Sequence, residues 1–433
     1  MKDLFKRIIV AILEIEARLI LRKYKPRIIA VTGSVGKTSA KDAIYAVLAD
    51  SEHVRKSEKS FNSEIGIPLT ILGRPNAWNS VVGWVKNIVS GIDLILFRQP
   101  YPKVLVLEIG ADRPGDIEKT GKWLSPDIVV VTWIGELPVH VEFFDSPEAI
   151  FREKAFLVKA LKPNGVLILN GDDERTSALS EMTEASVVTY GIDNDTHIRA
   201  SLIHAFYKRG KRVKTPAGVQ CKVKTENTIS QLRITGTIGR GYVYTALAGF
   251  TVGIVRGLSS EHITDALGSL TTTRGRMRLV EGMNGTTIID DTYNSSPVAV
   301  SEALNTLKTT EVSGRRIAVI GDMMELGAYS VEAHKAVGRL AVKSCDVLVT
   351  VGLRAQTIAR IANEAGMSEA SIYVADDEAD AGEFIESTID KGDLVLIKGS
   401  QSVRLEKVVK KIMLHPEDAP DLLVRQDDAW KVR

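Results

Sequence analysis

Short apolar runs alternate with helical patterns over the first half of the chain. Residues 28–31, 103–108, 127–132 and 165–170 are almost continuously apolar, which is typical of parallel strands covered by helices on both faces. Over residues 147–161 apolar side chains recur at the spacing of a helix. Strands and helices that alternate in this way predict a doubly wound α/β sheet.

The pattern changes near residue 192 and then resumes. Residues 192–238 combine polar alternation with Thr, Val and turn residues, and they predict a small antiparallel elaboration. Helical spacing returns at 243–255 and 260–270. A second strand series is expected at residues 286–290, 316–320, 347–351, 371–374 and 394–397. We therefore predict a central domain over residues 26–273 and a C-terminal Rossmann-like α/β domain over residues 274–433.

Residues 1–25 are predicted to form a separate amphipathic helix. An apolar run over 8–13 follows two basic residues, as in a signal peptide, but Glu14 and Glu16 interrupt the stretch and no small-residue cleavage site follows. The run is also far below the ~20 apolar residues of a membrane span. We favour a helix that packs on the chain itself or on a partner protein. The alternative is a membrane-surface helix whose basic residues lie near lipid headgroups, namely Lys6, Arg7, Arg18, Arg22, Lys23 and Lys25.

Length and composition indicate an ordinary globular protein. A chain of 433 residues is long enough for two or three domains, and its 25% charged and 44% hydrophobic residues are typical of such domains. A formal net charge of +2 argues against nucleic acid as a partner. Cys221 and Cys345 lie far apart and in no metal-binding spacing, so we expect a reduced, cytoplasmic protein.

The strongest chemical signal is a glycine-containing loop over residues 33–39. It lies between the strand at 28–31 and a helix over 40–48. Backbone N–H groups of such a loop converge on phosphate, and the helix dipole favours the negative charge. The compressed pattern Gly-x-x-Gly-Lys-Thr provides Lys37 for the phosphates and Thr38 for a magnesium ion. We predict an ATP site in a P-loop ATPase-type sheet, formed by Gly33, Ser34, Val35, Gly36, Lys37, Thr38 and Ser39.

Polar side chains also follow other strands of the first domain. In open α/β sheets ligands gather outside the carboxyl ends of the strands. Glu108 ends the strand at 103–108, which places a carboxylate beside the phosphate loop, and a carboxylate with a threonine hydroxyl suits magnesium. Glu108 could equally be a solvated charge at a strand end. His140, taken alone, is more typical of a surface histidine.

The second domain has two comparable clusters. Asp290 and Asp291 end a strand and are followed by Asn294, so they could form turn and cap bonds or could hold the hydroxyls of a ribose. Lys398-Gly399-Ser400 stands at the end of another strand. It resembles an anion site of the kind that a carboxylate substrate would use.

Together these motifs resemble the Mur ligase family, the ATP-dependent amide ligases of peptidoglycan synthesis, and in detail the branch that adds D-alanyl-D-alanine. The resemblance covers about residues 27 to 410. The motifs that carry it, in order, are Gly33–Thr38, Phe61–Pro68, Glu108–Ala111 with Pro114–Ile117, His140 with Glu142, Lys154, Gly275–Met277, Asp290-Asp291-x-Tyr293-Asn294, Gly321–Gly327 and Lys398–Ser400.

The resemblance implies a role for each matched residue. Asn62 would face the reacting acyl group, and Glu108 and His140 would hold magnesium directly or through water. Lys154, 14 residues beyond His140, matches the family's carbamylated lysine, which as an anion would bind a second magnesium ion. Arg276 would act with Lys37 on the γ-phosphoryl group. Asp291 would hold the ribose with Asn294 nearby, and Lys398 and Ser400 would bind substrate.

The implied reaction joins a carboxylate to an amine. ATP would convert the carboxylate, such as that of a UDP-muramoyl peptide, to an acyl phosphate, and the amine of D-alanyl-D-alanine would attack it. The alternatives are a related ligase with another acid substrate, such as a poly-glutamate or folate type, and a regulatory protein that binds ATP without ligation.

Three departures from the family pattern concern substrate recognition. Only about 26 residues precede the first strand, so we expect the family's N-terminal UDP-binding domain to be missing. The family's adenine-binding stretch appears as Gly239–Ala248 with its His and both Asn replaced, and Gly241, Tyr242 and Thr245 stand there instead. Tyr242 or Tyr244 could stack on the purine. Gln401 replaces the arginine that usually follows Lys-Gly-Ser.

Overall fold

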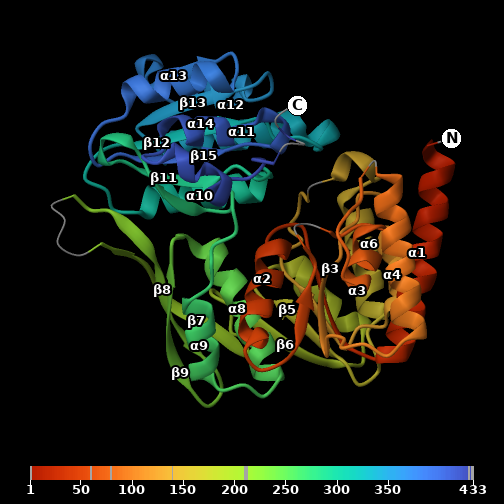
Figure 1. The fold of residues 1–433 in the computed structure, drawn as a ribbon. Helices are drawn as coiled ribbons and strands as arrows, with labels where there is room; N and C mark the ends of the chain where they lie inside the picture. The colour runs from red at the N-terminus through yellow and green to blue at the C-terminus, as the bar shows by residue number, and fades with distance from the viewer. Residues whose placement is uncertain are drawn as a thin grey trace. The chain divides into compact units, whose positions relative to one another are not determined.

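The computed structural model describes two compact units. The described residues are 2–58, 61–78, 80–138, 140–208, 213–427 and 430, with side chains from residue 6 onward. The N-terminal unit comprises residues up to 200 with 223–230 and 244–267, and the C-terminal unit comprises 201–222, 231–243 and residues from 268 (Figure 1). The predicted domain limits at 25/26 and 273/274 remain predictions.

The N-terminal unit is built on a parallel sheet. Among the described residues nine strands are hydrogen-bonded in the order β2-β3-β1-β4-β5-β6-β7-β8-β9, and the pairs from β2 to β7 are parallel. The strands are β1 (Arg27–Thr32), β2 (Val54–Lys56), β3 (Val104–Glu108), β4 (Ile128–Val131), β5 (Val166–Asn170), β6 (Ser186–Gly191), β7 (Ile198–Tyr207), β8 (Pro216–Lys224) and β9 (Ile229–Thr235). The four strands predicted from continuous apolar runs are confirmed.

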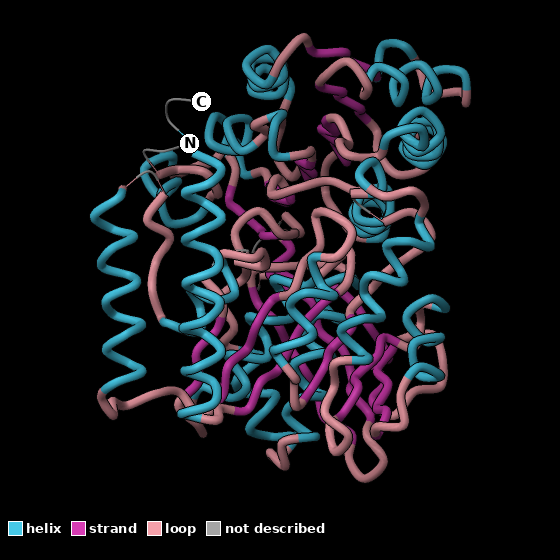
Figure 2. The backbone as a smooth tube through the Cα atoms, turned by 90° about the vertical axis from the view of Figure 1, so that its right-hand side faces the viewer, coloured by secondary structure: helices cyan, strands magenta, loops and turns pink. Residues whose placement is uncertain are grey.

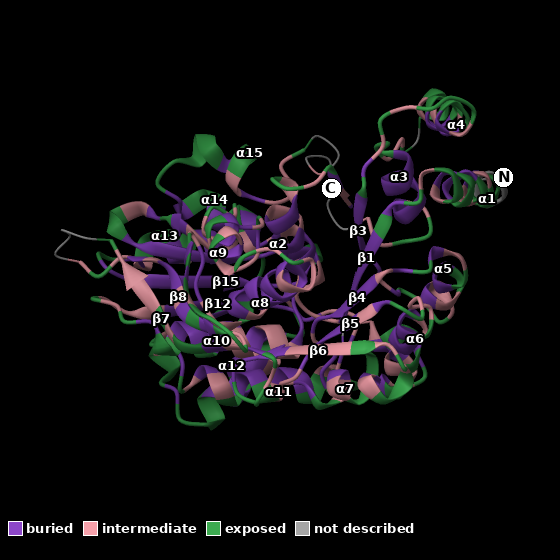
Figure 3. Ribbon diagram, turned by 90° about the horizontal axis from the view of Figure 1, so that it is seen from below, coloured by how far each residue is buried: buried purple, intermediate pink, exposed green. Residues whose placement is uncertain are grey.

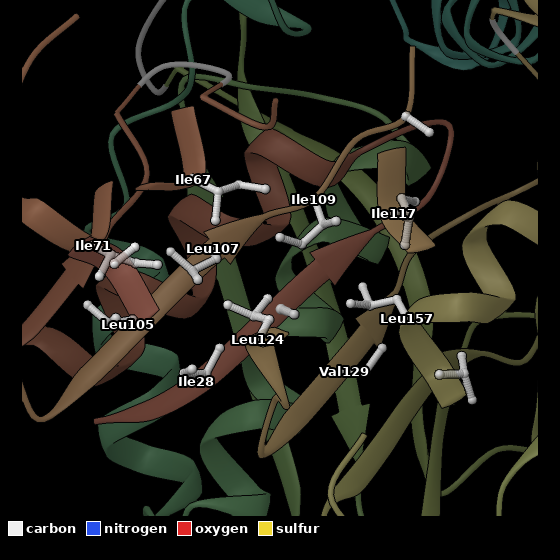
Figure 4. Close-up of a cluster of buried hydrophobic side chains, with 14 of the residues drawn as sticks. Ile28, Ile67, Ile71, Leu105, Leu107, Ile109, Ile117, Leu124, Val129 and Leu157 are labelled. Atoms are coloured by element: carbon white, nitrogen blue, oxygen red, sulfur yellow. The ribbon is translucent and has the colours of Figure 1, made fainter. Parts of the chain in front are cut away.

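Helices cover both faces of this sheet, as the buried runs require (Figure 3). They are α1 (Lys2–Tyr24), α2 (Lys37–Ala49), α3 (Gly66–Leu72), α4 (Val81–Leu96), α5 (Asp116–Leu124), α6 (Pro147–Lys159), α7 (Glu174–Ser177), α8 (Arg240–Val255) and α9 (Ser260–Gly268). Alternate strand residues such as Ile28, Leu105 and Val129 face α3, α5 and α6 in one buried cluster (Figure 4). Each such buried side chain contributes roughly 1.5–3 kcal/mol to the hydrophobic stabilisation of the fold.

The antiparallel elaboration over residues 192–238 stays a prediction as a unit, although β7 at its start pairs parallel to β6 and the two following strands run antiparallel. Thr225 N donates to Thr228 O at 2.9 Å, and Gly236 N donates to Ala217 O at 2.9 Å. The paired residue numbers run in opposite directions, so β8 and β9 form a hairpin. Parts of these strands are grouped with each of the two units.

The C-terminal unit contains the second βαβ series. Its described strands are paired in the order β10-β11-β15-β12-β13-β14, all parallel except the pair β10–β11. They are β10 (Arg278–Glu281), β11 (Thr287–Asp291), β12 (Arg316–Gly321), β13 (Val347–Val351), β14 (Ile372–Ala375) and β15 (Leu394–Lys398). The helices are α10 (Pro297–Thr309), α11 (Ser330–Ala341), α12 (Gln356–Glu364), α13 (Glu378–Thr388), α14 (Glu406–Ile412) and α15 (Ala419–Leu422). The five predicted strands are confirmed, and β10 is an additional edge strand.

The N-terminal helix α1 packs on its own chain, as predicted. Ile9, Leu13, Ala17 and Ile20 are buried at helical spacing against α3 and α4. Figure 2 shows α4 beside α1 at the outer edge of the unit. Within the part of the chain that the structure describes, no helix has the length and apolarity of a membrane span.

The contact between α1 and α4 contains a buried carboxyl group. Glu16 is only 4% exposed, and neither carboxyl oxygen has a hydrogen-bond partner among the described residues. Gly91 makes this approach possible, since a Cβ there would lie 2.2 Å from Glu16 Oε2. Burial raises the pKa of Glu16 to about 7.

Glu16 is expected to make stability depend on pH. Its folded pKa is raised above the ordinary value of 4.5, so the folded state binds the extra proton and stability falls as pH rises from about 4.5 to about 7. Glu16→Gln keeps the shape and removes the titration. We expect thermal unfolding at pH 8 to shift upward by roughly 3 °C or more, with little change at pH 4.5. Glu14→Gln, on the same helix but partly exposed, is the control. If Glu16→Gln changed the melting temperature equally at both pH values, titration of Glu16 would be excluded as the cause.

Candidate active site

A loop at residues 33–36 joins β1 to α2, which begins at Lys37, three residues before the predicted start at residue 40, and one close contact fixes the loop. Gly33 has φ 142°, and a Cβ at this position would lie 2.1 Å from Thr132 Oγ1. Ser34 N donates to Trp133 O at 2.6 Å, so the segment after β4 holds the loop. Gly36 precedes α2 in the left-handed conformation, with φ 84°. Only glycine meets both requirements without strain.

Two of the predicted phosphate ligands begin helix α2. Lys37 Nζ donates to Gly33 O at 2.9 Å and to Ser34 O at 3.4 Å, so the side chain folds back over the loop. Thr38 is buried in the first turn. Helical N–H groups of a first turn have no carbonyl partner within the helix, and the dipole adds positive charge there. The geometry is that of an anion site.

Glu108 lies beside this loop, as predicted. Strand pairing places it opposite Val31, the residue two positions before Gly33. Asn62 Nδ2 donates to Glu108 Oε1 at 3.4 Å, so two predicted site residues from different segments meet. Glu108 Oε2 is buried and has no hydrogen-bond partner among the described residues. An orphaned carboxylate oxygen of this kind suits a cation.

Sequence reasoning missed Lys41, which shares this environment. Its ammonium lies 3.8 Å from Glu108 Oε2 and 3.7 Å from Asp42 Oδ1, and the residue is only 1% exposed. Burial lowers the pKa of Lys41, and the two carboxylates oppose that effect. The only sequence signal was a lysine one turn after Lys37 on a largely buried helix.

Lys154 is directed at the phosphate loop from α6. Its Nζ donates to Gly33 O at 3.1 Å, and the side chain is buried. Burial, together with the nearby charge of Lys37, lowers the pKa of Lys154 to about 7, although Glu153 opposes this. Glu153 was also missed. It accepts hydrogen bonds from Gly115 N at 2.8 Å and Ile117 N at 2.7 Å, and thereby fixes α6 to the start of α5.

The structure does not assemble a complete metal site of protein side chains. Among the described residues no three His, Cys, Asp or Glu are placed to hold a metal ion. His140 is half-buried with φ 67° before the turn Val141–Phe143. Asp173, another residue that sequence reasoning missed, supports the segment after β4 by accepting from Ile134 N at 2.8 Å. The metal roles of Thr38, Glu108, His140 and Lys154 remain predictions.

The two tyrosines considered for purine stacking have different environments. Tyr242 is buried, and its hydroxyl accepts from Thr273 N at 3.3 Å. Tyr244 donates to Asp172 Oδ2 at 2.8 Å, and its ring meets Trp133 edge to face at 5.8 Å. Since Trp133 holds the phosphate loop, Tyr244 is the better candidate for a contact with the base.

In the C-terminal unit, two predicted residues pair with each other. Asp291 Oδ2 and Lys398 Nζ are 2.7 Å apart, and both side chains are buried at opposed positions of β11 and β15. Asp291 Oδ1 accepts from Met277 N at 3.2 Å, and Lys398 also donates to Asn294 O at 2.9 Å. Burial lowers the pKa of Lys398, and Asp291 opposes this. The pair therefore anchors the Asp-Asp-x-Tyr-Asn motif.

Other side chains around the Asp-Asp-x-Tyr-Asn motif are also held in place by their contacts. Burial raises the pKa of Asp290 to about 6, although bonds from Thr292 favour the charged form. Arg276 stacks on the ring of Tyr293, with its guanidinium carbon 4.2 Å from the centroid. Arg425, which sequence reasoning missed, donates to Thr292 O at 2.5 Å. These contacts fix the backbone after β11.

Ser400 braces a different segment of the unit. Its hydroxyl accepts from Met324 N at 2.9 Å, and its own N–H donates to Asp322 O at 3.0 Å. Both residues belong to the predicted motif at 321–327. The proposed substrate contacts of Lys398 and Ser400 remain predictions, and so do the ribose contacts of Asp291 and Asn294.

Comparison with protein families gives two matches. Residues 89–253 match the Mur ligase middle domain, and residues 275–401 match the Mur ligase glutamate ligase domain. Together they cover more than half of the chain.

Relatives and solved structures agree with this assignment. The UDP-N-acetylmuramoyl-tripeptide–D-alanyl-D-alanine ligase of Bacillus subtilis is 30% identical over 92% of this chain and 79% of that protein, and that of Mycobacterium leprae is 31% identical over 87% and 72%. MurF ligase from Thermotoga maritima, solved in complex with ADP, superposes with a TM-score of 0.75 at 25% identity, over 93% of this chain and 83% of that one. These coverages do not support the expectation of a missing N-terminal domain.

The buried pair of Asp291 and Lys398 yields a stability prediction. Lys398→Met leaves the Asp291 carboxylate buried without its cation, so we expect the C-terminal unit to lose about 3 kcal/mol of unfolding free energy in urea denaturation. Asp291→Asn combined with Lys398→Met removes both charges and should recover most of that loss. A cost below about 1 kcal/mol for Lys398→Met would show that the pair does not hold the motif together.

Proposed function

The chain belongs to the Mur ligase family, and we propose that it is an ATP-dependent, ADP-forming amide ligase of peptidoglycan precursor synthesis. The relatives named above are ligases of UDP-N-acetylmuramoyl-tripeptide and D-alanyl-D-alanine. We infer the same acyl and amine substrates here. The observation that carries the proposal is Lys154 Nζ, buried and 3.1 Å from the carbonyl oxygen of Gly33 in the phosphate loop.

The first step would transfer the γ-phosphoryl group of ATP to the substrate carboxylate. Catalysis of this step depends on positioning and on neutralisation of charge. Lys37 and the first turn of α2 would bind the phosphates, and Arg276 would neutralise charge on the transferred group. The acyl phosphate formed would then be attacked by the amine of D-alanyl-D-alanine, giving an amide and inorganic phosphate.

We infer that Glu108 and Thr38 would hold a magnesium ion. Glu108 Oε2 supports this assignment because it is buried and accepts no hydrogen bond among the described residues, its neighbouring cation being Lys41 at 3.8 Å. His140 would contribute directly or through water. When bound, the ion would neutralise negative charge on the phosphate oxygens. Asn62, held against Glu108, would face the acyl group.

We propose that Lys154 is carbamylated in the active enzyme. Carbamylation needs the neutral amine, which attacks CO2 to form an N–C bond and releases a proton. With its pKa near 7, Lys154 would be largely neutral above neutral pH, unlike a lysine of ordinary pKa ~10.4. The carbamate would replace a cation with an anion beside Lys37. That exchange would relieve the repulsion between two ammonium groups and provide a ligand for a second magnesium ion.

The remaining substrate contacts are assigned from the motif positions. Asp291 and Asn294 would bind the ribose, and Lys398 and Ser400 would bind a carboxylate of the substrate. Trp133 and Tyr244 would contact the purine. The buried indole Nε1 of Trp133 has no hydrogen-bond partner among the described residues, which supports a ligand there.

One experiment separates this function from its alternatives. Phosphate release from ATP would be measured with D-alanyl-D-alanine and with UDP-muramoyl tripeptide, each alone and then together. Release that requires both substrates supports the ligase. Absence of release with both substrates, together with release when another acid replaces the tripeptide, would point to a related ligase, and ATP binding without turnover would point to a regulatory protein.

Lys37→Ala should abolish ATP turnover, with a loss of at least ~100-fold in kcat. The lysine contacts the loop rather than the core, so the melting temperature should be unchanged. Phosphate release and thermal unfolding measure the two effects. Lys119→Ala, on the exposed side of α5, is the control, and full turnover in a folded Lys37→Ala protein would contradict the nucleotide site.

Lys154→Ala should lose most ligation but retain ATP binding. The carbamate would be lost, whereas the glycine loop and Lys37 would remain. Small carboxylates should partly restore activity by replacing the anion. Carbon-13 NMR of the wild type in labelled bicarbonate should show a carbamate signal that grows as pH rises through about 7. Lys159→Ala, on the exposed side of the same helix, is the control, and near wild-type ligation in Lys154→Ala would refute the role.

A further inference from the structure

Helix α4 presents apolar side chains to solvent along its whole length. The exposed apolar positions are Val81, Val82, Val85, Val89, Ile92 and Leu96, each between 45% and 68% exposed. From Val85 to Leu96 the intervals are four, three and four residues, which places these side chains on one face. Trp78, 72% exposed, precedes the helix, and Phe97, 61% exposed, follows it.

The packing of α4 does not account for this face. Its other side already carries the core contacts, since Trp84 and Leu94 are buried and Gly91 receives Glu16 of α1. Surface helices of globular domains normally have a polar outer side. Figure 2 shows α4 as the outermost helix of the N-terminal unit, and its outer side is exposed in Figure 3.

The neighbouring helix extends the apolar surface. On α1, Ile8, Ile15 and Leu19 are 40% to 58% exposed at intervals of seven and four residues. Single exposed apolar residues need no explanation, but exposed apolar residues repeated along two helices that pack together mark an interaction surface. We call it the α1/α4 face.

The net charge of the segments that carry this face indicates the chemistry of its partner. Residues 1–27 and 74–103 together contain twelve Lys and Arg against four Asp and Glu, a net charge of +8. The whole chain has a net charge of +2, so the remaining residues carry 44 basic against 50 acidic side chains, or −6. Positive charge is thus concentrated on the segments that carry the apolar face.

A basic cavity lies at the C-terminal ends of the same two helices. It has a volume of about 550 Å³ and is lined by Lys25, Arg27, Arg98 and Lys103, and also by Arg256, which pairs with Glu52. Tyr24 and Tyr101 stack beside it with ring centroids 4.4 Å apart. Because Arg98 lies two residues after the end of α4, this positive cavity adjoins the apolar face.

We propose that the α1/α4 face docks on the surface of an anionic lipid bilayer. The apolar residues of α4 would enter the interface in the plane of the membrane, and the basic residues would meet lipid phosphates. A second copy of the chain is disfavoured, since the two segments that carry the face, with a net charge of +8, would lie opposite identical segments. The aromatic residues at both ends of α4 are typical of anchors at a membrane interface.

The test uses the full chain and vesicles of defined composition. Sedimentation would be compared for phosphatidylcholine alone and for phosphatidylcholine containing about one-third phosphatidylglycerol. We expect at least ~10-fold more bound protein on the anionic vesicles, and less at high salt. The fluorescence of Trp78 should shift to shorter wavelength on binding, and that part of the shift should be absent in Trp78→Phe.

A matched pair of variants locates the contact. Val85→Glu with Val89→Glu adds two carboxylates to the face and should reduce binding at least ~10-fold. Ile229→Glu with Leu353→Glu makes the same change at exposed residues elsewhere and should bind as the wild type does. All proteins should show equal melting temperatures, because the four substituted residues are exposed. ATP turnover should also be equal, because none of these residues contacts the phosphate loop.

Three outcomes would overturn the proposal. They are absence of wild-type binding to either vesicle, equal binding by the Val85→Glu/Val89→Glu variant, and a wild-type dimer that this variant dissociates while vesicles remain unbound. The last outcome, detected by light scattering, would assign the face to a second copy. Since ligation is measured separately with small-molecule substrates, failure here leaves the proposed reaction unaffected.

Discussion

The close approach of Gly33 to the segment after β4 is the constraint on which the N-terminal site depends. A side chain at Gly33 would collide with Thr132, so the loop can turn back only where no Cβ is present. That turn directs the Gly33 carbonyl oxygen at two lysines, Lys37 and Lys154, which both donate to it. Two ammonium groups on one neutral acceptor repel each other. The site is therefore electrostatically incomplete without an anion, which is the property required of a phosphate site.

The buried charges among the predicted site residues fall into two kinds, and the difference separates structure from function. Asp291 and Lys398 satisfy each other and the adjacent backbone, so they stabilise their unit without a ligand. Glu108 Oε2 accepts no hydrogen bond among the described residues and has the Lys41 ammonium 3.8 Å away, and Lys154 Nζ donates to the neutral carbonyl oxygen of Gly33 rather than to a carboxylate. An incompletely satisfied charge is costly to bury, and it persists where a ligand supplies the missing partner.

The sequence predicted what periodicity and local chemistry determine. Continuous apolar runs located β1, β3, β4 and β5, because parallel strands are buried on both faces. The phosphate loop was recognisable because glycine, lysine and threonine act within nine residues of one another. Lys41 and Glu153 were missed because their partners lie 67 and 36 residues away, at Glu108 and Ile117, and no local pattern shows that a charged residue will be buried.

Helix α4 shows that an apolar sequence does not reveal which surface will cover a helix. Its polar residues are few, namely Lys86, Asn87, Ser90 and Asp93, and a helix with so many apolar residues is normally covered over most of its surface. In the structure one side of α4 packs against α1, and the opposite side is exposed to solvent. Lys23 of α1 donates to the carbonyl oxygens of Leu94 and Phe97 at the end of α4. The sequence analysis made no prediction for α4, and its hydrophobicity alone does not identify the surface that covers it. Charge provides the missing information, since a net +8 beside an apolar face distinguishes an anionic surface from the interior of the protein.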